Sequence, residues 1–227
     1  MNANLTEIAF VLDRSGSMES VKGAAIEGFN EFLREQQAAP GQARLSVVLF
    51  DDEYLLQVDA VPVEEVIPLN AATYQPRNST ALLDAIGRTI DDLGKRLETL
   101  PEQYRPGKVV VAILTDGLEN ASTTYTWRDV AKRIKHQTQK YQWDFLFLGA
   151  NQDAIATAAQ LSIAAQNAAS YVGDNVGNVA GAAALARKMS AGRFVRSGRA
   201  TAAEHAAAAA PMEQLVQEED KKRRDGE

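Results

Sequence analysis

Two stretches of the chain are continuously apolar and then give way to an aspartate. Residues 8–12 stop directly before Asp13, and residues 109–114 pass through Thr115 into Asp116. An unbroken apolar run of this length is typical of a β-strand that is buried on both faces, as in a parallel sheet covered by helices. Similar runs at 45–50 and 145–148, with a weaker one at 169–172, predict further strands of the same kind.

Segments with helical spacing of apolar residues alternate with these strands. We expect helices at 18–37, 80–98, 127–140, from Asn151 onward and at 174–189. The acidic turn Asp51-Asp52-Glu53 predicts a hairpin to a short strand at 54–58, and the three prolines in 59–79 predict a loop with one short helix. The order predicts an α/β, doubly wound, mostly parallel open sheet of Rossmann-like type, with one antiparallel edge strand and helices on both faces.

The length of 227 residues suits one domain with an appendage, since domains commonly have roughly 100 to 200 residues. We place the domain at 1–192. Residues 193–227 form an alanine-rich and charged tail or helix, because the alanine run at 206–210 favours a helix but offers little apolar area to bury.

Composition excludes several classes of function. Lys and Arg total 24 against 30 Asp and Glu, which gives a net charge of −6 and disfavours a nucleic-acid partner. The chain has no cysteine and two histidines, so any metal must be held by oxygen, as Mg²⁺, Mn²⁺ or Ca²⁺ are. The start lacks a basic region, and the apolar run at 8–12 is too short for a signal peptide or membrane span, so we expect a cytoplasmic protein without membrane contact.

Oxygen-bearing side chains follow two of the predicted strands. The sequence Asp13-Arg14-Ser15-Gly16-Ser17 comes after the first strand, and Asp116-Gly117 comes after the strand at 109–114. In open α/β sheets the carboxyl ends of the strands form the ligand crevice, so the two carboxylates converge if the strands are neighbours. Two carboxylates with hydroxyls would make an oxygen-only cation site.

These residues resemble the metal-ion-dependent adhesion site of von Willebrand factor type A domains. The resemblance covers residues 6–190 and rests on Asp-x-Ser-x-Ser, a later loop threonine and Thr-Asp-Gly. It implies that a divalent cation, usually Mg²⁺, is held by five residues. They are Asp13, Ser15, Ser17, Thr80 and Asp116. Ser79 and Thr73 are alternatives to Thr80, which we favour because it stands at the head of the helix at 80–98.

The resemblance also implies a binding function without catalytic residues. In the family, a carboxylate from a partner protein fills an open position on the metal. Compact relatives resemble accessory subunits of AAA+ ATPases or larger complexes, so we expect a partner of that kind. The helix at 174–189 could shift between two positions, as it does in relatives.

Two other functions compete with this interpretation. Asp13 could be the nucleophile of a metal-dependent phosphotransfer hydrolase, but Ser15 stands where such enzymes usually have a second acid, and no lysine is clearly placed for the phosphoryl group. The chain could also be a metal-independent scaffold that binds through its C-terminal tail. A serine hydrolase is disfavoured because we expect His136 to lie on the solvent side of its helix.

Several of the polar residues also have ordinary structural interpretations. Ser15 or Ser17 could cap the following helix, and Asn78 and Ser79 are expected to cap the helix at 80–98. The acidic turn at 51–53 is expected to be solvated, with an accessory cation as the alternative. Two further expectations concern the rim of the site. Asp84 lies on the polar side of its helix or beneath the site, and Glu119 and Asn120 are expected to be surface residues, with partner selection as the alternative.

Overall fold

The computed structural model describes residues 1–150 and 153–226, and its centre is a six-stranded sheet. The strands are β1 (Asn2–Asp13), β2 (Gln42–Phe50), β3 (Tyr54–Pro62), β4 (Pro106–Thr115), β5 (Asp144–Ala150) and β6 (Ala168–Tyr171). Their order is β3-β2-β1-β4-β5-β6, and every pair is parallel except β2 with β3. The predicted sheet, including its antiparallel edge strand, is confirmed.

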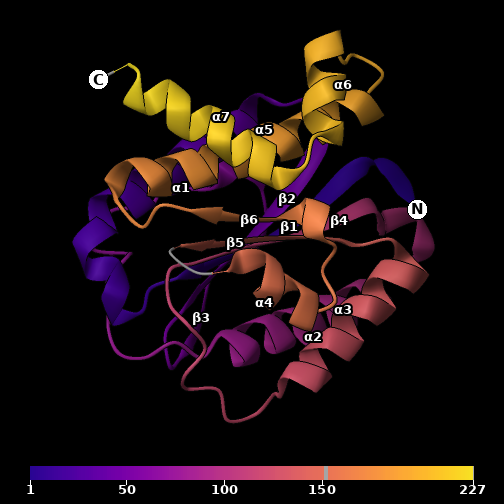
Figure 1. Cartoon of the computed structure of the whole chain (residues 1–227). Coiled ribbons are helices and arrows are strands. Elements are labelled where there is room, and N and C mark those ends of the chain that lie inside the picture. The colour runs from indigo at the N-terminus through magenta and orange to yellow at the C-terminus, as the bar shows by residue number, and fades with distance from the viewer. Residues whose placement is uncertain (151–152, 227) are drawn as a thin grey trace.

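Helices cover both faces of this sheet (Figure 1). On one face lie α1 (Lys22–Ala38) and α5 (Asn175–Arg196), and on the other lie α2 (Leu82–Thr99), α3 (Trp127–Tyr141) and α4 (Ala154–Gln160). The predicted start of a helix at Asn151 lies outside the described residues, and Asp153 caps α4 by accepting a hydrogen bond from the N–H of Ala156. In the part of the chain that the structure describes, no helix combines the length and apolar character needed to cross a bilayer.

Strand β1 has apolar side chains on both faces because it lies between two cores. Ile8, Phe10 and Leu12 pack in the core under α1 and α5, whereas Ala9 and Val11 pack in the core under α2 and α3. Side chains of a strand point alternately to opposite faces, so only a continuous apolar run can fill both cores. This is the physical reason for the run at 8–12.

The loop after β3 contributes to the core rather than lying over it. A single 3₁₀ turn, Val63–Glu65, follows β3, which confirms the one short helix predicted in 59–79. Val63, Val66, Leu69 and Tyr74 are all buried, so this proline-containing segment is held against the domain by its apolar side chains.

The C-terminal segment forms two helices that pack on the domain. Helix α5 passes the predicted boundary at 192 and ends at Arg196, and α6 (Ala202–Ala209) and α7 (Met212–Arg224) then lie across it (Figure 1). Met212, Leu215 and Val216 are buried in the same core as β1. The alanine run at 206–210 has little apolar surface, as predicted, but residues just after it supply the apolar surface that packs on the domain.

Candidate metal centre

The ends of β1 and β4 bring the first group of polar residues together. The two strands are parallel neighbours, and Leu12 is paired with Leu114. Asp13 and Asp116 therefore lie at the same end of the sheet, at the carboxyl ends of β1 and β4, as expected if the two strands are neighbours. The tight turn after Asp13 is anchored by Gly16, whose N–H donates to the carbonyl of Asn78 at 3.0 Å.

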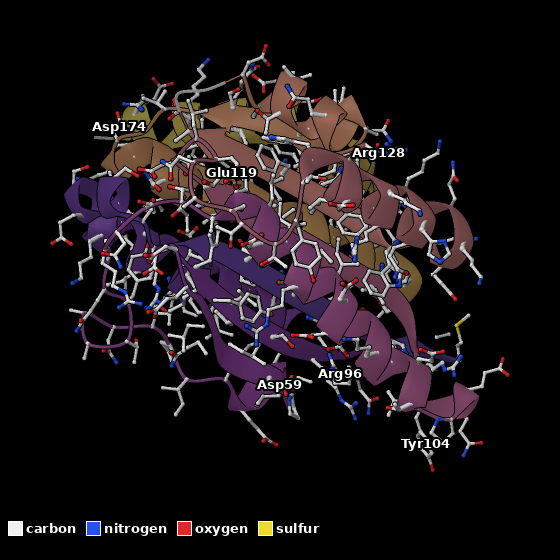
Figure 2. All side chains as sticks on the ribbon, turned by 90° about the horizontal axis from the view of Figure 1, so that it is seen from below. Asp59, Arg96, Tyr104, Glu119, Arg128 and Asp174 are labelled. Atoms are coloured by element: carbon white, nitrogen blue, oxygen red, sulfur yellow. The ribbon has the colours of Figure 1, made fainter. Side chains whose placement is uncertain are left out.

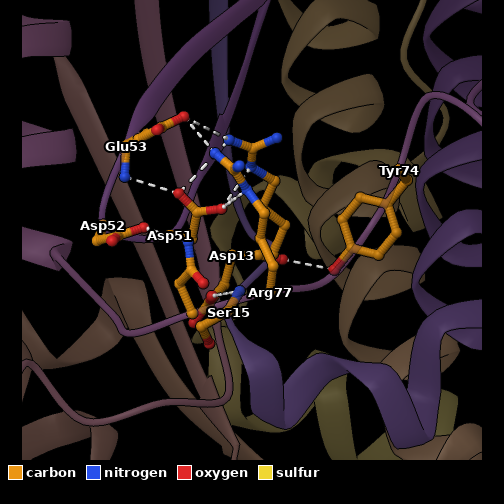
Figure 3. A network of polar contacts seen from close by, with 9 residues as sticks. Asp13, Ser15, Asp51, Asp52, Glu53, Tyr74 and Arg77 are labelled. Carbon is orange, nitrogen blue, oxygen red and sulfur yellow. Dashed lines mark hydrogen bonds and ion pairs between the residues drawn. The ribbon is translucent and has the colours of Figure 1, made fainter.

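Four of the five candidate residues are joined by hydrogen bonds. The hydroxyl of Ser17 donates to Oδ1 of Asp116 at 2.5 Å, and the hydroxyl oxygens of Ser15 and Ser17 are 3.1 Å apart. The N–H of Ser15 donates to Oδ1 of Asp13 at 2.6 Å (Figure 3). The other carboxylate oxygen of Asp13 accepts a hydrogen bond from the Thr115 hydroxyl, also at 2.6 Å.

Thr80, the fifth candidate, lies close to the other four because its side chain and that of Asp13 both pack near Gly117. A Cβ atom on Gly117 would lie 2.5 Å from Thr80 Oγ1 and 3.4 Å from Asp13 Oδ2. The threonine hydroxyl and the carboxylate thus converge on a position that only glycine leaves open. Of the two alternatives to Thr80, Ser79 is exposed, and the Thr73 hydroxyl donates to the carbonyl of Asn70.

The serine hydroxyls are not used as helix caps. Ser15 precedes the 3₁₀ turn Gly16–Val21 but makes no side-chain capping hydrogen bond. The capping interpretation of Asn78 and Ser79 is wrong, because α2 is capped from another loop. Glu119 Oε2 accepts from the N–H of Leu83 at 2.9 Å, and the Ser122 hydroxyl accepts from the next N–H of the helix at 3.0 Å.

The loop after β4 is therefore tied to the loop that carries Thr80. The N–H of Thr80 donates to Oδ1 of Asn120 at 2.9 Å, and its carbonyl accepts from the N–H of the same asparagine at 3.0 Å. Asp84 lies on this side of α2 as well, where it accepts hydrogen bonds from the N–H groups of 123–125. Glu119, labelled in Figure 2, belongs to the loop after β4, and its side chain reaches the first turn of α2.

Burial raises the pKa of both carboxylates, and charge repulsion adds to the shift at Asp116. Asp13 is 0% exposed, and this burial raises its pKa, although hydrogen bonds from Thr115 and Ser15 oppose the shift. Burial also raises the pKa of Asp116; the hydrogen bond from Ser17 lowers it, and the charge of Asp13 raises it further. Both shifts indicate that the ionised forms lack a compensating positive charge.

The acidic turn at 51–53 is solvated at Asp52 and Glu53, as expected, but not at Asp51. Asp51 is buried, and its Oδ2 lies 2.7 Å from Nε of Arg77 and 3.2 Å from Nε of Arg14 (Figure 3). Arg77 also pairs with Glu53. Two guanidinium groups thus neutralise the buried carboxylate. The pairs fasten the Asp13 loop to the β2–β3 hairpin.

Two buried phenols support the same strand ends from outside the sequence motifs. The Tyr74 hydroxyl donates to the carbonyl of Asp13 at 2.5 Å (Figure 3), and the Tyr171 hydroxyl donates to the carbonyl of Thr115 at 3.2 Å. Burial raises the pKa of both phenols well above its ordinary value, so both remain hydrogen-bond donors. Nothing in the sequence around either tyrosine signals this role.

The donor set fits a hard divalent cation. It offers two carboxylates and three hydroxyls near the carboxyl ends of β1 and β4, so every ligand atom would be an oxygen. The two carboxylates bring negative charges close together, which favours a cation. Among residues 1–150 and 153–226 no group of three or more His, Cys, Asp or Glu side chains could hold a metal. A metal site here thus depends on the hydroxyls.

Comparisons with known proteins place the fold. No protein-family model matches the chain, and no curated protein is significantly similar to it. Among solved structures, a von Willebrand factor type A protein from Catenulispora acidiphila is 16% identical with a TM-score of 0.54, and the match covers 83% of this chain and 42% of that one. Proximal thread matrix protein 1 from the mussel byssus is 15% identical with a TM-score of 0.55, covering 85% of this chain and 46% of that one.

A third structure, the manganese-loaded TRAP protein of Plasmodium vivax, is 12% identical with a TM-score of 0.54, and the match covers 76% of this chain and 70% of that one. The chain spans less than half the length of the mussel and Catenulispora proteins. The sheet order, the antiparallel edge strand and the helices on both faces agree with these matches. The protein therefore has the fold of von Willebrand factor type A domains.

Proposed function

We propose that the chain is a divalent-cation-dependent protein-binding module. The observation that carries this proposal is the convergence of five oxygen-bearing side chains near the carboxyl ends of β1 and β4, namely Asp13, Ser15, Ser17, Thr80 and Asp116. Within residues 1–150 and 153–226, neither carboxylate of this group forms an ion pair. These five residues would hold the cation. The TRAP structure of the same fold is described as manganese-loaded, which supports a divalent ion.

The chemistry of the donors suits recognition of an acid. Hydroxyls are neutral, so a cation held largely by them keeps much of its charge and attracts a further carboxylate. Leu118, which follows Gly117 and is 67% exposed, would offer apolar contact beside that carboxylate. We propose a protein partner with an exposed Asp or Glu, in the cytoplasm, with Mg²⁺ as the resident ion; an AAA+ ATPase is one partner class that the family resemblance suggests.

The burial of Asp13 favours binding over phosphotransfer. A nucleophilic carboxylate must reach the phosphorus atom, yet Asp13 is 0% exposed and both of its oxygens accept hydrogen bonds. Of the two histidines, His136 lies exposed on α3 and His205 is exposed on α6. Neither is placed as a base for Ser15 or Ser17, so we propose that the protein is not an enzyme.

The test is calorimetric titration of Mg²⁺ and of Mn²⁺ into metal-stripped protein. We expect saturable binding to the wild type and to Asp92→Ala, which removes a half-exposed carboxylate of α2, and no binding to Asp116→Ala. Equal binding to all three proteins would refute the site. For the recognition step, acetate added to the Mn²⁺-loaded protein should reduce the water-proton relaxation rate by displacing bound water. An unchanged rate would contradict the proposed carboxylate position.

A further inference from the structure

A cavity lies between α5 and the sheet face that α1 and α5 cover, and none of the five candidate metal-binding residues lines it. Its volume is about 320 Å³. Ile8 of β1, Val110 of β4 and Leu146 of β5 form its floor, and α5 forms a wall. Residues 208–210 at the end of α6 lie across it, so the C-terminal helices complete the enclosure.

Three cationic side chains of α5 line this cavity: Lys188, Arg193 and Arg196. Within residues 1–150 and 153–226, none of them has a carboxylate within the 4.0 Å of an ion pair. The acidic residue in the lining, Asp144, is paired with Lys108 at 2.8 Å. The cavity therefore carries an excess of positive charge in a chain whose net charge is negative.

Arg193 is the most deeply placed of the three, with 3% of its surface exposed. Its terminal nitrogens donate to main-chain carbonyls of Gln36, Ala39 and Gly41, but Nε has no hydrogen-bond partner. Burial lowers the pKa of this guanidinium to about 10. Carbonyl dipoles orient the group, yet they do not supply the opposite charge that a buried cation needs.

The other two cations also keep hydrogen-bonding capacity. The ammonium of Lys188 donates to the carbonyls of Ala208 and Ala210, which leaves one of its three N–H groups. Arg196 is exposed at the mouth of the cavity and donates to the hydroxyl of Thr6 at 2.8 Å. A guanidinium in that position can pair with both oxygens of a carboxylate or phosphate.

We propose that this cavity binds a small organic oxyanion, with Arg196 as the recognition group and Lys188 and Nε of Arg193 supplying further donors. The volume is at the lower end of the range for small-molecule sites, which begins at roughly 300 Å³, so a compact metabolite fits better than a polymer. Phosphate esters and di- or tricarboxylates share the required chemistry. This inference uses no residue of the metal centre and does not depend on the proposed function.

The test measures anion binding to the metal-stripped full chain. Inorganic phosphate and citrate are titrated separately, with sodium chloride at matched ionic strength as the reference, and the thermal midpoint and the heat of binding are recorded. We expect a saturable rise of the midpoint with at least one of the two anions. The anion that acts shows whether phosphate or carboxylate is the preferred chemistry.

Two variants with the same charge change make the test specific. Arg196→Gln is expected to weaken binding at least about tenfold, because one charge-assisted hydrogen bond is lost. Arg199→Gln removes an exposed arginine three residues further along and should bind like the wild type, as should Asp116→Ala. The inference is overturned if neither anion binds saturably, or if binding to Arg196→Gln and to Arg199→Gln is equal.

Discussion

Replacing Gly117 by alanine should disable the metal centre without unfolding the protein. The new Cβ would lie 2.5 Å from Thr80 Oγ1, whereas ordinary contacts to a Cβ begin at 3.4 Å, so the hydroxyl must retreat by about 0.9 Å. Rotation of the threonine does not relieve the contact, because its methyl carbon is already 3.3 Å away. The Thr80 backbone is held by hydrogen bonds to Asn120 at 2.9 and 3.0 Å and cannot follow freely.

The expected magnitudes follow from this geometry. Crowding of a packed position costs about 1–3 kcal/mol of folding free energy. Displacing a group that holds a metal lowers affinity roughly 10- to 100-fold, which is about 1.4–2.7 kcal/mol. Asp13 Oδ2, at 3.4 Å from the new atom, stays in place, so the loss is attributable to the threonine.

The assay is calorimetric Mg²⁺ or Mn²⁺ titration, with urea unfolding to measure stability. Gly94→Ala is the matched control, because its Cβ would meet only Gln137 Nε2 at 3.5 Å, and alanine should stabilise α2 by about 0.5–1 kcal/mol. Thr80→Val should weaken metal binding similarly, and the double variant should lose little more, since Gly117→Ala displaces the same hydroxyl that Thr80→Val removes. If Gly117→Ala binds metal as tightly as the wild type, Thr80 does not hold the ion.

Three further outcomes can be measured by chemical denaturation. Asp51→Ala should destabilise the protein by about 3 kcal/mol, because the buried Arg14 loses its partner at 3.2 Å and keeps only Glu53 at 4.0 Å, whereas Ala at the exposed Glu53 should cost less than about 1 kcal/mol; equal costs would contradict the assigned burial. Leu215→Ala in α7 should cost about 2–5 kcal/mol, and no cost would mean that α7 does not pack on the domain. Burial raises the pKa of Glu7 above its ordinary value of 4.5 despite its partner Arg96, so the native state binds the proton more tightly than the unfolded state does. The free energy of unfolding should therefore fall as the pH rises from 4.5 through the raised pKa of the native state. Glu7→Gln should flatten this part of the pH profile, and an unchanged profile would refute the assignment.

The surroundings of Glu7 also indicate why such a carboxylate is tolerated at a strand position. Arg96 Nη2 lies 2.6 Å from Glu7, and Arg96 Nε lies 4.0 Å from Asp59 (Figure 2). The arginine is therefore shared between β1 and the edge strand β3, and it links both to the end of α2.

The sequence alone predicts the sheet because short, continuous apolar runs indicate strands that are buried on both faces. Residues 8–12 and 109–114 are apolar at every position, and each is a strand that packs against helices on both faces. The convergence of Asp13 and Asp116 follows from the pairing of those two strands. Local pattern and global topology agree at this point: the sequence predicts the convergence on the condition that the two strands are neighbours, and their pairing meets that condition.

Contacts between distant segments account for what the sequence does not predict. Glu119 accepts a hydrogen bond from the N–H of Leu83, 36 positions earlier, and Asp51 is buried because two arginines from other loops reach it. Tyr74 supports the Asp13 carbonyl across 61 positions of sequence. The sequence around each of these residues contains no motif that indicates its contact, because the contacting segments come together only in the folded chain.

The hydrogen bonds between the Thr80 loop and residues 119–122 have a thermodynamic consequence for binding. A loop that orders only when a ligand arrives loses conformational entropy at that moment, and the loss subtracts from affinity. Here the capped start of α2 and both backbone groups of Thr80 are already fixed by the second loop. The conformational entropy of these two segments is lost when the chain folds. An ion that binds later therefore finds its ligand oxygens already positioned, and its binding changes the order of the backbone little.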